Sequence, residues 1–190
     1  MSQPPVGILL AAGQGRRFGS NKLVYNLLDD TPMLLVTAQK LACVLPDSIA
    51  VINQDLIPYT RQLEQTGLRV VVNTQADRGM GSSIACGVLA SPDASGWLIT
   101  LADMPYVRTE TIHQLAARLK DGADIVAPVY LDQRGHPVGF HRCHKEELAK
   151  LGDDIGARHI IRKHKKKVEL VTTHDAGVIM DVDQSADIVG

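Results

Sequence analysis

The chain has 190 residues, of which 45% are hydrophobic, and carries a formal net charge of −1. This length and composition indicate one folded domain and exclude a disordered chain, and the near-zero charge excludes general electrostatic binding to nucleic acid. The three cysteines, Cys43, Cys86 and Cys143, form no disulfide framework, which indicates a reducing, cytoplasmic setting. The N-terminal segment has neither the basic region of a signal peptide nor an apolar run long enough to span a membrane.

Short apolar runs alternate with helix-like segments through the first two thirds of the chain. In order, the sequence predicts a strand at 6–11, a helix from Thr31-Pro32 to about 44, a strand at 48–52, a helix at 55–65, a strand at 68–72, a helix at 81–89 and a strand at 97–101. Pro32 is expected at the first helical position, and Gly67 is expected to end the second helix. Because the β-branched runs lack polar alternation, both faces of the sheet should be buried.

The order of elements changes after residue 129. An amphipathic helix at 109–120, stopped by Asp121-Gly122, and a strand at 125–129 continue the alternation. A strand at 137–140, helices at 145–151 and 157–163, and closing strands at 168–171 and 178–182 then follow. We therefore expect an α/β fold of one domain, with a mostly parallel sheet covered by helices on both faces.

A glycine-rich, basic turn follows the first predicted strand. It carries Gly13, Gly15, Arg16, Arg17 and Lys22, so that backbone N–H groups and three cations can surround the phosphates of a nucleotide triphosphate. Phe18 stands where a Walker loop or a dinucleotide fingerprint needs glycine, so neither pattern fits. The alternative is an ordinary basic loop between a strand and a helix.

Two acidic residues are candidate metal ligands at strand ends. Asp103 follows the strand at 97–101, and Asp183 follows the last predicted strand, where alternation puts Asp181 and Asp183 on one face. Mg²⁺ prefers one or two carboxylates together with phosphates and water. The alternatives are that Asp103 caps the next turn and that Asp183 lies in an ordinary acidic turn or caps a helix.

Three further polar residues follow the third strand. Asn73 ends it, and Ser82 and Ser83 open the next helix. The amide of Asn73 offers both a hydrogen-bond donor and an acceptor to a base edge. The hydroxyl groups of Ser82 and Ser83 either contact the base edge in the same way or cap the helix.

The segment from Arg134 to Val138 combines a cation, a glycine and a histidine before Pro137. By its residues alone, His136 fits a turn better than a catalytic role. The basic run 162–167 is typical of a solvated helix end, and the alternative is that it helps to hold an anionic cofactor or a partner enzyme.

The sequence resembles the molybdenum cofactor nucleotidyltransferases. Their loop, L-x-x-G-x-x-x-R-x-G-x-x-K, is matched by Leu10, Gly13, Arg17, Gly19 and Lys22. Family members carry Mg²⁺ ligands in a leucine-x-Asp-Met-Pro segment and a closing Asp-x-Asp-Thr-Pro segment, which Asp103 and Asp183 match. Gln184 and Ser185 replace the Thr and Pro of the second segment.

This resemblance implies a Rossmann-like nucleotidyltransferase domain over residues 1–190, with a nucleotide part at about 1–105 and an acceptor part at about 106–190. It implies nucleotide-binding roles for Leu10, Ala11, Ala12, Gly13, Gly15, Arg17, Lys22, Asn73, Ser82 and Ser83. Arg17, Lys22 and Asp103 are expected to be catalytic. The Gly-His-Pro segment and the stretch 152–158 match the cytidylyl-type branch, and they imply an acceptor site of Arg134, Gly135, His136, Pro137 and Arg158.

The implied reaction is Mg²⁺-dependent transfer of CMP from CTP to the terminal phosphate of molybdopterin. Guanylyl-type members read Leu-Ala-Gly-Gly at the loop start, whereas this chain has alanine at position 12, whose methyl group leaves less room for a purine. Transient contact with a molybdenum-dependent oxidoreductase is also implied, with no nucleic-acid or membrane partner. Two alternatives stay open: a cytidylyltransferase for a sugar or polyol phosphate, and a non-catalytic molybdopterin carrier.

Overall fold

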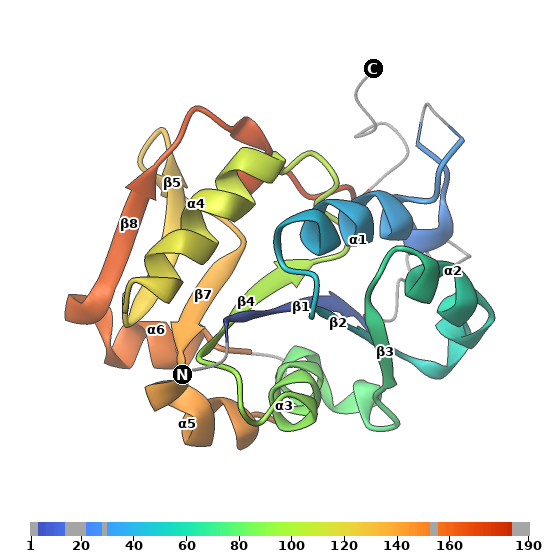
Figure 1. Ribbon diagram of the computed structural model, residues 1–190, viewed down its shortest axis with the longest axis horizontal. Helices are drawn as coiled ribbons and strands as arrows, with labels where there is room; N and C mark the ends of the chain where they lie inside the picture. The colour runs from blue at the N-terminus through green and yellow to red at the C-terminus, as the bar shows by residue number, and fades with distance from the viewer. Residues whose placement is uncertain (1–3, 14–21, 28–29, 153–155, 184–190) are drawn as a thin grey trace.

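The structure is a computed structural model that describes residues 4–13, 22–27, 30–152 and 156–183. These residues form a sheet in the strand order β3-β2-β1-β4-β7-β5-β6, with β8 also paired to β5 (Figure 1). The strands are β1 (Val6–Ala11), β2 (Ile49–Ile52), β3 (Arg69–Val72), β4 (Gly96–Leu101), β5 (Ile125–Tyr130), β6 (Gln133–Arg134), β7 (Val138–His141) and β8 (Val168–Thr172).

The first four strands of the sheet run parallel to one another. β1 pairs in parallel with β2 and β4, and β2 pairs in parallel with β3. The strand β7 lies between β4 and β5 and is antiparallel to both, while β5 and β8 are again parallel. The prediction of a mostly parallel sheet is therefore confirmed, with two antiparallel strands, β7 and the short β6, where the order of elements changes.

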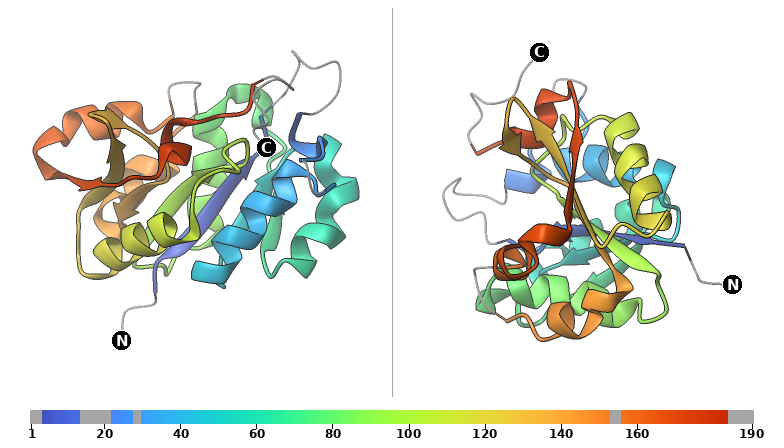
Figure 2. Two further views of the ribbon diagram at one scale, coloured as in Figure 1. Left: turned by 90° about the horizontal axis from the view of Figure 1, so that it is seen from above. Right: turned by 90° about the vertical axis from the view of Figure 1, so that its left-hand side faces the viewer.

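Helices cover both faces of this sheet (Figure 2). One face carries α1 (Met33–Val44), α2 (Thr60–Gln65) and α4 (Thr109–Lys120), and the other carries α3 (Met80–Ala90), α5 (Lys145–Ala149) and α6 (Arg158–Lys163). Along β1, Leu9 belongs to the first core, whereas Ile8 and Leu10 belong to the second. Because successive strand residues point to opposite faces, an uninterrupted apolar strand supplies both cores.

The predicted closing strand at 178–182 is wrong. The chain there forms the 3₁₀ helix η7 (Ala176–Ile179), and residues 180–183 have no regular structure. The cause is local capping, because the Asp175 carboxylate accepts hydrogen bonds from the N–H groups of Gly177 and Arg108, at 3.0 and 2.8 Å. The strand alternation that placed Asp181 and Asp183 on one face therefore does not exist.

Two predicted helices begin later than expected. Pro32 is the N-cap of α1 and forms an isolated β-bridge with Asn26, so it precedes the helix instead of opening it. The first half of the predicted helix 55–65 is the 3₁₀ helix η3 (Gln54–Tyr59), and it contains Pro58, which cannot donate a helical hydrogen bond. No helix among the described residues is long and apolar enough to cross a membrane.

Candidate active site

The ends of β1 and β4 bring the first residues of the predicted nucleotide loop close to the segment that contains Asp103. Leu10 is paired with Leu101 across the two strands, and the N–H of Ala102 donates to the Leu10 carbonyl at 3.1 Å. Ala11 and Ala12 are buried at this edge, and Gly13 is exposed beyond them. Gly15 and Arg17, together with Arg16 and Gly19, lie outside the described residues.

Lys22 lies between the two predicted metal ligands. Its Nζ atom is 2.9 Å from a carboxylate oxygen of Asp103 and 2.7 Å from one of Asp183. Burial by itself would lower the pKa of the Lys22 ammonium, but its hydrogen bonds to Asp183 and Asp103 and their charges raise that pKa above its usual value. Two carboxylates from distant parts of the chain therefore converge on one cation, an arrangement that fits a divalent ion with oxygen ligands.

Asn73, Ser82 and Ser83 form one buried cluster. The Asn73 amide donates to the Ser82 and Ser83 hydroxyl oxygens at 2.9 and 3.1 Å, and its oxygen accepts from the N–H of Gln75 at 2.9 Å. Neither serine caps α3, because the N-cap is Gly79 and no side chain caps the helix. The structure brings the three predicted residues together, and their bonds hold the start of α3 against the end of β3.

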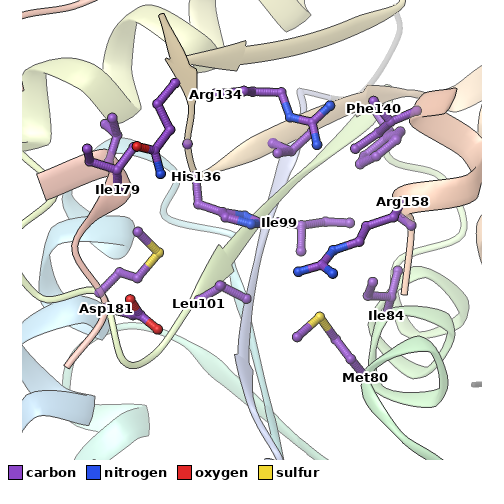
Figure 3. Close-up of a pocket in the computed structure, with 17 residues that line it drawn as sticks. Met80, Ile84, Ile99, Leu101, Arg134, His136, Phe140, Arg158, Ile179 and Asp181 are labelled. Atoms are coloured by element: carbon purple, nitrogen blue, oxygen red, sulfur yellow. The ribbon is translucent and has the colours of Figure 1, made fainter. Parts of the chain in front are cut away.

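A cavity of about 500 Å³ lies next to Asp103, because Leu101 and Met104, on either side of Asp103 in the chain, line it. Figure 3 shows its lining residues. Of the predicted acceptor residues, Arg134, Gly135, His136 and Arg158 line it, while Pro137 does not. Its other lining residues come from α3, β4 and the turn after it, β6, β7, α6 and its N-cap, and the segment from η7 onward: Met80, Ile84, Ile99, Leu101, Met104, Gln133, Val138, Phe140, Ala157, Ile161, Val178, Ile179 and Asp181. Most of the lining residues are thus apolar, and the polar ones include two guanidinium groups and one imidazole.

The acceptor segment is held by the backbone of η7. The N–H of His136 donates to the Val178 carbonyl at 2.8 Å, and the peptide bond between His136 and Pro137 is cis. A Cβ atom on Gly135 would overlap the Val178 carbonyl and lie 2.7 Å from its carbon. Position 135 therefore needs glycine for close backbone approach, not for an unusual backbone conformation.

His136 is held in its neutral form. Burial is the largest cause, and the charges of Arg134 and Arg158 add to it, so that the pKa of the imidazole is about 4 although Asp103 acts to raise it. Its Nδ1 atom is buried and has no hydrogen-bond partner among the described residues. The neutral ring therefore has one nitrogen available to a ligand of the cavity.

Sequence reasoning missed several cavity residues. Met80 stands within the segment interpreted as base-binding, yet it lines the acceptor cavity. The sequence pattern indicates Asp181 only as a neighbour of Asp183, yet Asp181 lines the cavity. For Ile179 the sequence offered no signal, because an apolar residue in an apolar run is not distinguished from a core residue.

A known protein family matches the part of the chain that contains most of the candidate site residues. A family model described as MobA-like NTP transferase domain matches residues 7–168. The chain belongs to this family of nucleotidyltransferases. The match runs from β1 to the first residue of β8 and includes Asp103, His136 and Arg158. The resemblance inferred from the motifs is thus confirmed at the level of the family, and the site described above is the candidate active site of a MobA-like transferase.

Two curated relatives show how widely names vary among similar chains. This MobA-like chain is 29% identical over 195 residues to nicotine blue oxidoreductase of Paenarthrobacter nicotinovorans, covering 93% of this chain and 91% of that protein. It is 28% identical over 147 residues to a probable molybdenum cofactor guanylyltransferase of Geobacillus sp. (strain WCH70), covering 76% of this chain and 74% of the relative.

Solved structures agree with the fold. The structure is similar to the crystal structure of Rv0371c from Mycobacterium tuberculosis H37Rv, with a TM-score of 0.82 and 26% identity over 98% of this chain and 96% of that one. A crystal structure of Rv0371c in complex with manganese gives a TM-score of 0.77 and 25% identity, over 97% of this chain and 96% of that one. The Rossmann-like nucleotidyltransferase fold of this MobA-like chain is therefore confirmed.

Proposed function

We propose that this protein is a molybdenum cofactor cytidylyltransferase, which transfers CMP from CTP to the terminal phosphate of molybdopterin and releases pyrophosphate. The observation that carries the proposal is the cavity next to Asp103. Leu101 and Met104, on either side of Asp103, line this cavity together with Arg134 and Arg158. An acceptor bound there would have its phosphate near the cations and close to the metal ligands.

Asp103 and Asp183 are the residues that would hold Mg²⁺, because both carboxylates already converge on the Lys22 ammonium. When bound, the ion would supply charge neutralisation to the phosphates. Lys22 keeps its proton, since its pKa is raised, and together with Arg17 it would stabilise the negative charge that develops on the leaving pyrophosphate.

The cavity residues supply positioning. Arg134 and Arg158 would bind the acceptor phosphate by charge-assisted hydrogen bonds, and the apolar wall around Ile99 and Phe140 would pack against the pterin rings. Neutral His136 would present Nδ1 to a polar edge of the pterin. An oxygen of the acceptor phosphate then attacks the α-phosphorus of CTP, a new P–O bond forms, and the bond to pyrophosphate breaks in line.

Ala12 supports CTP as the donor. It is 3% exposed at the end of β1, and Asn53 donates its side-chain amide to the Ala12 carbonyl at 3.4 Å. We infer that the methyl group narrows the base site against purines, whereas the Geobacillus relative is named a guanylyltransferase. The same proposal assigns nucleotide binding to the cluster of Asn73, Ser82 and Ser83 and to Leu10, Ala11, Gly13 and Gly15. It also divides the chain into a donor half at about 1–105 and an acceptor half at about 106–190.

The oxidoreductase name of the Paenarthrobacter relative does not fit this chain's own loop. Phe18 breaks the glycine pattern that dinucleotide-binding folds use, so the loop favours a triphosphate. We propose that the product is handed to a molybdenum-dependent oxidoreductase in the cytoplasm.

The decisive experiment is pyrophosphate release by the purified protein with Mg²⁺, comparing CTP, GTP, ATP and UTP with and without molybdopterin. Release with CTP and molybdopterin together supports the proposal. Release with a sugar or polyol phosphate instead of molybdopterin would overturn the acceptor assignment. Molybdopterin binding without any pyrophosphate release would overturn catalysis and favour a carrier.

A further inference from the structure

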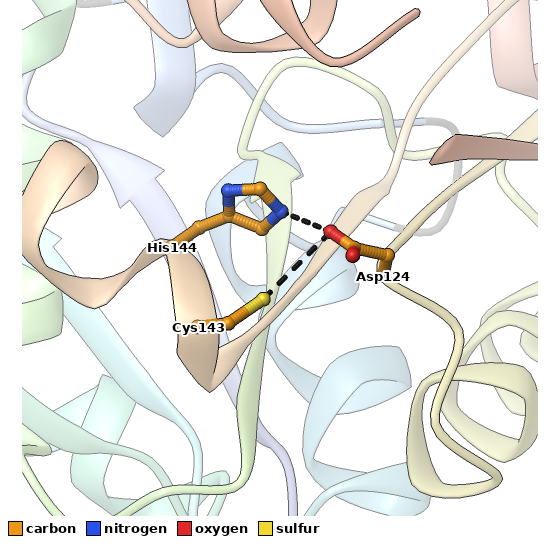
Figure 4. A group of neighbouring side chains, drawn as sticks. All are labelled: Asp124, Cys143 and His144. Atoms are coloured by element: carbon orange, nitrogen blue, oxygen red, sulfur yellow. Dashed lines mark hydrogen bonds and ion pairs between the residues drawn. The ribbon is translucent and has the colours of Figure 1, made fainter. Parts of the chain in front are cut away.

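A second cluster of polar side chains surrounds His144, and none of its members lines the acceptor cavity. His144 follows β7 in the 3₁₀ helix η5 (Arg142–His144) and is only 2% exposed. Its Nε2 atom makes a short hydrogen bond with the Asp124 carboxylate, and the Cys143 Sγ lies 3.7 Å from the same carboxylate oxygen (Figure 4). One side of the imidazole is therefore fixed by Asp124.

The other side of the ring is unsatisfied. The Nδ1 atom of His144 is buried without a hydrogen-bond partner among the described residues, and it faces an Oε1 atom of Glu147 at 3.7 Å. The Nε2 atom of His164, the C-cap of α6, lies 2.9 Å from that same oxygen. When Nε2 of the neutral His144 ring donates to Asp124, Nδ1 carries a lone pair, which can bind a cation that lies between it and the Glu147 carboxylate oxygen.

We propose that His144, Glu147 and His164 form a Zn²⁺ site, with Asp124 as the carboxylate that orients His144. One ligand atom from each of the three side chains lies within 4.8 Å of the others. Ligands of a tetrahedral zinc ion lie roughly 3.3 Å apart when each bond is about 2 Å, and the distances of 3.7 and 2.9 Å to the Glu147 oxygen fall on either side of that value.

The pattern of contacts is the one that zinc-binding histidines use. Such a histidine donates its second ring N–H to a carboxylate, which fixes its tautomer and its orientation, and Asp124 supplies that carboxylate here. Two imidazoles and a carboxylate suit Zn²⁺ in charge and softness, and they leave a fourth position for water. The ion would replace the present hydrogen bond between His164 and Glu147.

The neighbouring group of Asp124, Cys143 and His144 is a poorer candidate. Partial burial and the charge of Asp124 raise the pKa of the Cys143 thiol, so a metal would have to displace a more tightly held proton there. Asp124 is also bonded to Lys167 at 2.8 Å. Lys163 contacts only the outer oxygen of Glu147, at 2.7 Å, which leaves Oε1 for the ion, and both lysines are more than half exposed, so solvent screens their charges.

The site would connect α5 to the end of α6. Glu147 lies on α5, and α6 begins with Arg158, which lines the acceptor cavity, and is capped by His164. A bound ion would therefore fix the helix that carries an acceptor residue. This inference does not depend on the nucleotide or on the acceptor, because none of its residues belongs to the proposed active site.

The test is Zn²⁺ binding by the full chain, stripped of metal with a chelator and then titrated in excess Mg²⁺, with Co²⁺ as a spectroscopic probe. We expect one Zn²⁺ per chain, a higher melting temperature, and the visible absorption of four-coordinate Co²⁺. His164→Gln and Glu147→Gln should each weaken Zn²⁺ binding at least about tenfold, and either variant serves if the other fails to fold.

Two control variants distinguish Zn²⁺ binding at this site from Zn²⁺ binding by other side chains. His159→Gln removes an exposed imidazole from the same helix and should keep the wild-type affinity. Asp103→Asn should also keep it, since Asp103 belongs to the proposed Mg²⁺ site. Absence of saturable Zn²⁺ binding in the wild-type chain, or equal affinity in the wild type, His164→Gln and Glu147→Gln, would overturn the proposal.

Discussion

The Nζ atom of Lys22 lies 2.7 Å from a carboxylate oxygen of Asp183, which links the end of the glycine-rich loop to the last described residues of the chain. Asp103 contacts the same ammonium from the end of β4. The backbone also connects the two acidic segments, because the N–H of Val182 donates to the Asp103 carbonyl at 2.9 Å. Three segments far apart in the sequence thus meet at the Lys22 ammonium group.

Replacing either acid should abolish turnover without unfolding the chain. Asp103→Ala or Asp183→Asn would remove one of the two proposed metal ligands, and we expect a loss of at least about 100-fold in kcat. Pyrophosphate release checks the rate, and circular dichroism checks the fold. Asp47→Asn, an exposed acid in the turn before β2, is the control and should keep full activity. Near-normal turnover by Asp103→Ala would contradict the metal assignment.

Arg158 should act on the acceptor and not on the nucleotide. The Arg158→Gln variant loses a charge-assisted hydrogen bond to the acceptor phosphate, so we expect KM for molybdopterin to rise about 10- to 100-fold. KM for CTP should stay within about twofold. Arg162→Gln changes an exposed arginine of the same helix that does not line the cavity, and it should leave both constants unchanged. An equal rise in both KM values for Arg158→Gln would contradict an acceptor role.

The donor preference should depend on the methyl group of Ala12. Ala12→Gly removes a group that we propose faces the base site, and the ratio of kcat/KM for GTP to that for CTP should rise by roughly tenfold. Pyrophosphate release measured with each nucleotide separately gives the two kcat/KM values and hence this ratio. An unchanged ratio would show that selectivity lies elsewhere. A wild-type preference for GTP would reject the cytidylyl assignment altogether.

His136 should make stability depend on pH below neutrality. The pKa of the folded imidazole is about 4, against the usual 6.5, so the unfolded chain binds more protons between these values. The free energy of unfolding should therefore fall as the pH drops from about 6.5 towards 4, and His136→Asn should remove this part of the slope. Urea unfolding at several pH values measures it. His113→Asn, which removes an exposed imidazole of α4, corrects for the loss of one histidine. Identical slopes for the wild type and His136→Asn would contradict a buried neutral imidazole.

Some candidate site residues could be predicted because polar residues directly after an apolar strand can be identified from the sequence alone. Asp103 comes directly after an apolar strand, so its neighbours in the sequence make it a candidate ligand, whereas only the family resemblance implies an acceptor role for Arg134-Gly135-His136. The family was also recognised from short motifs, and the match over residues 7–168 confirms it. The choice of CTP stays a prediction, and the roles of Gly15 and Arg17 concern positions outside the described residues.

The error at 178–182 has a different cause. Its apolar run has the composition of a strand, but Asp175 caps a 3₁₀ turn there and Gly177 lies against the backbone of Tyr106. A Cβ atom on Gly177 would lie 2.7 Å from the backbone nitrogen of Val107. Hydrophobic periodicity reports which residues are buried, and it does not report such a contact between distant segments.

The sequence by itself determined that the chain forms a helix-covered, mostly parallel sheet with its polar residues at strand ends, since burial pattern and turn chemistry are properties of neighbouring residues. Only the tertiary structure decided that Lys22 reaches Asp183, that Met80 and Ile179 share a cavity with Arg158, and that His144 contacts Asp124. These pairs depend on the strand order and on the antiparallel insertion of β7 between β4 and β5. Such contacts form between residues far apart in the chain, and no local pattern encodes them.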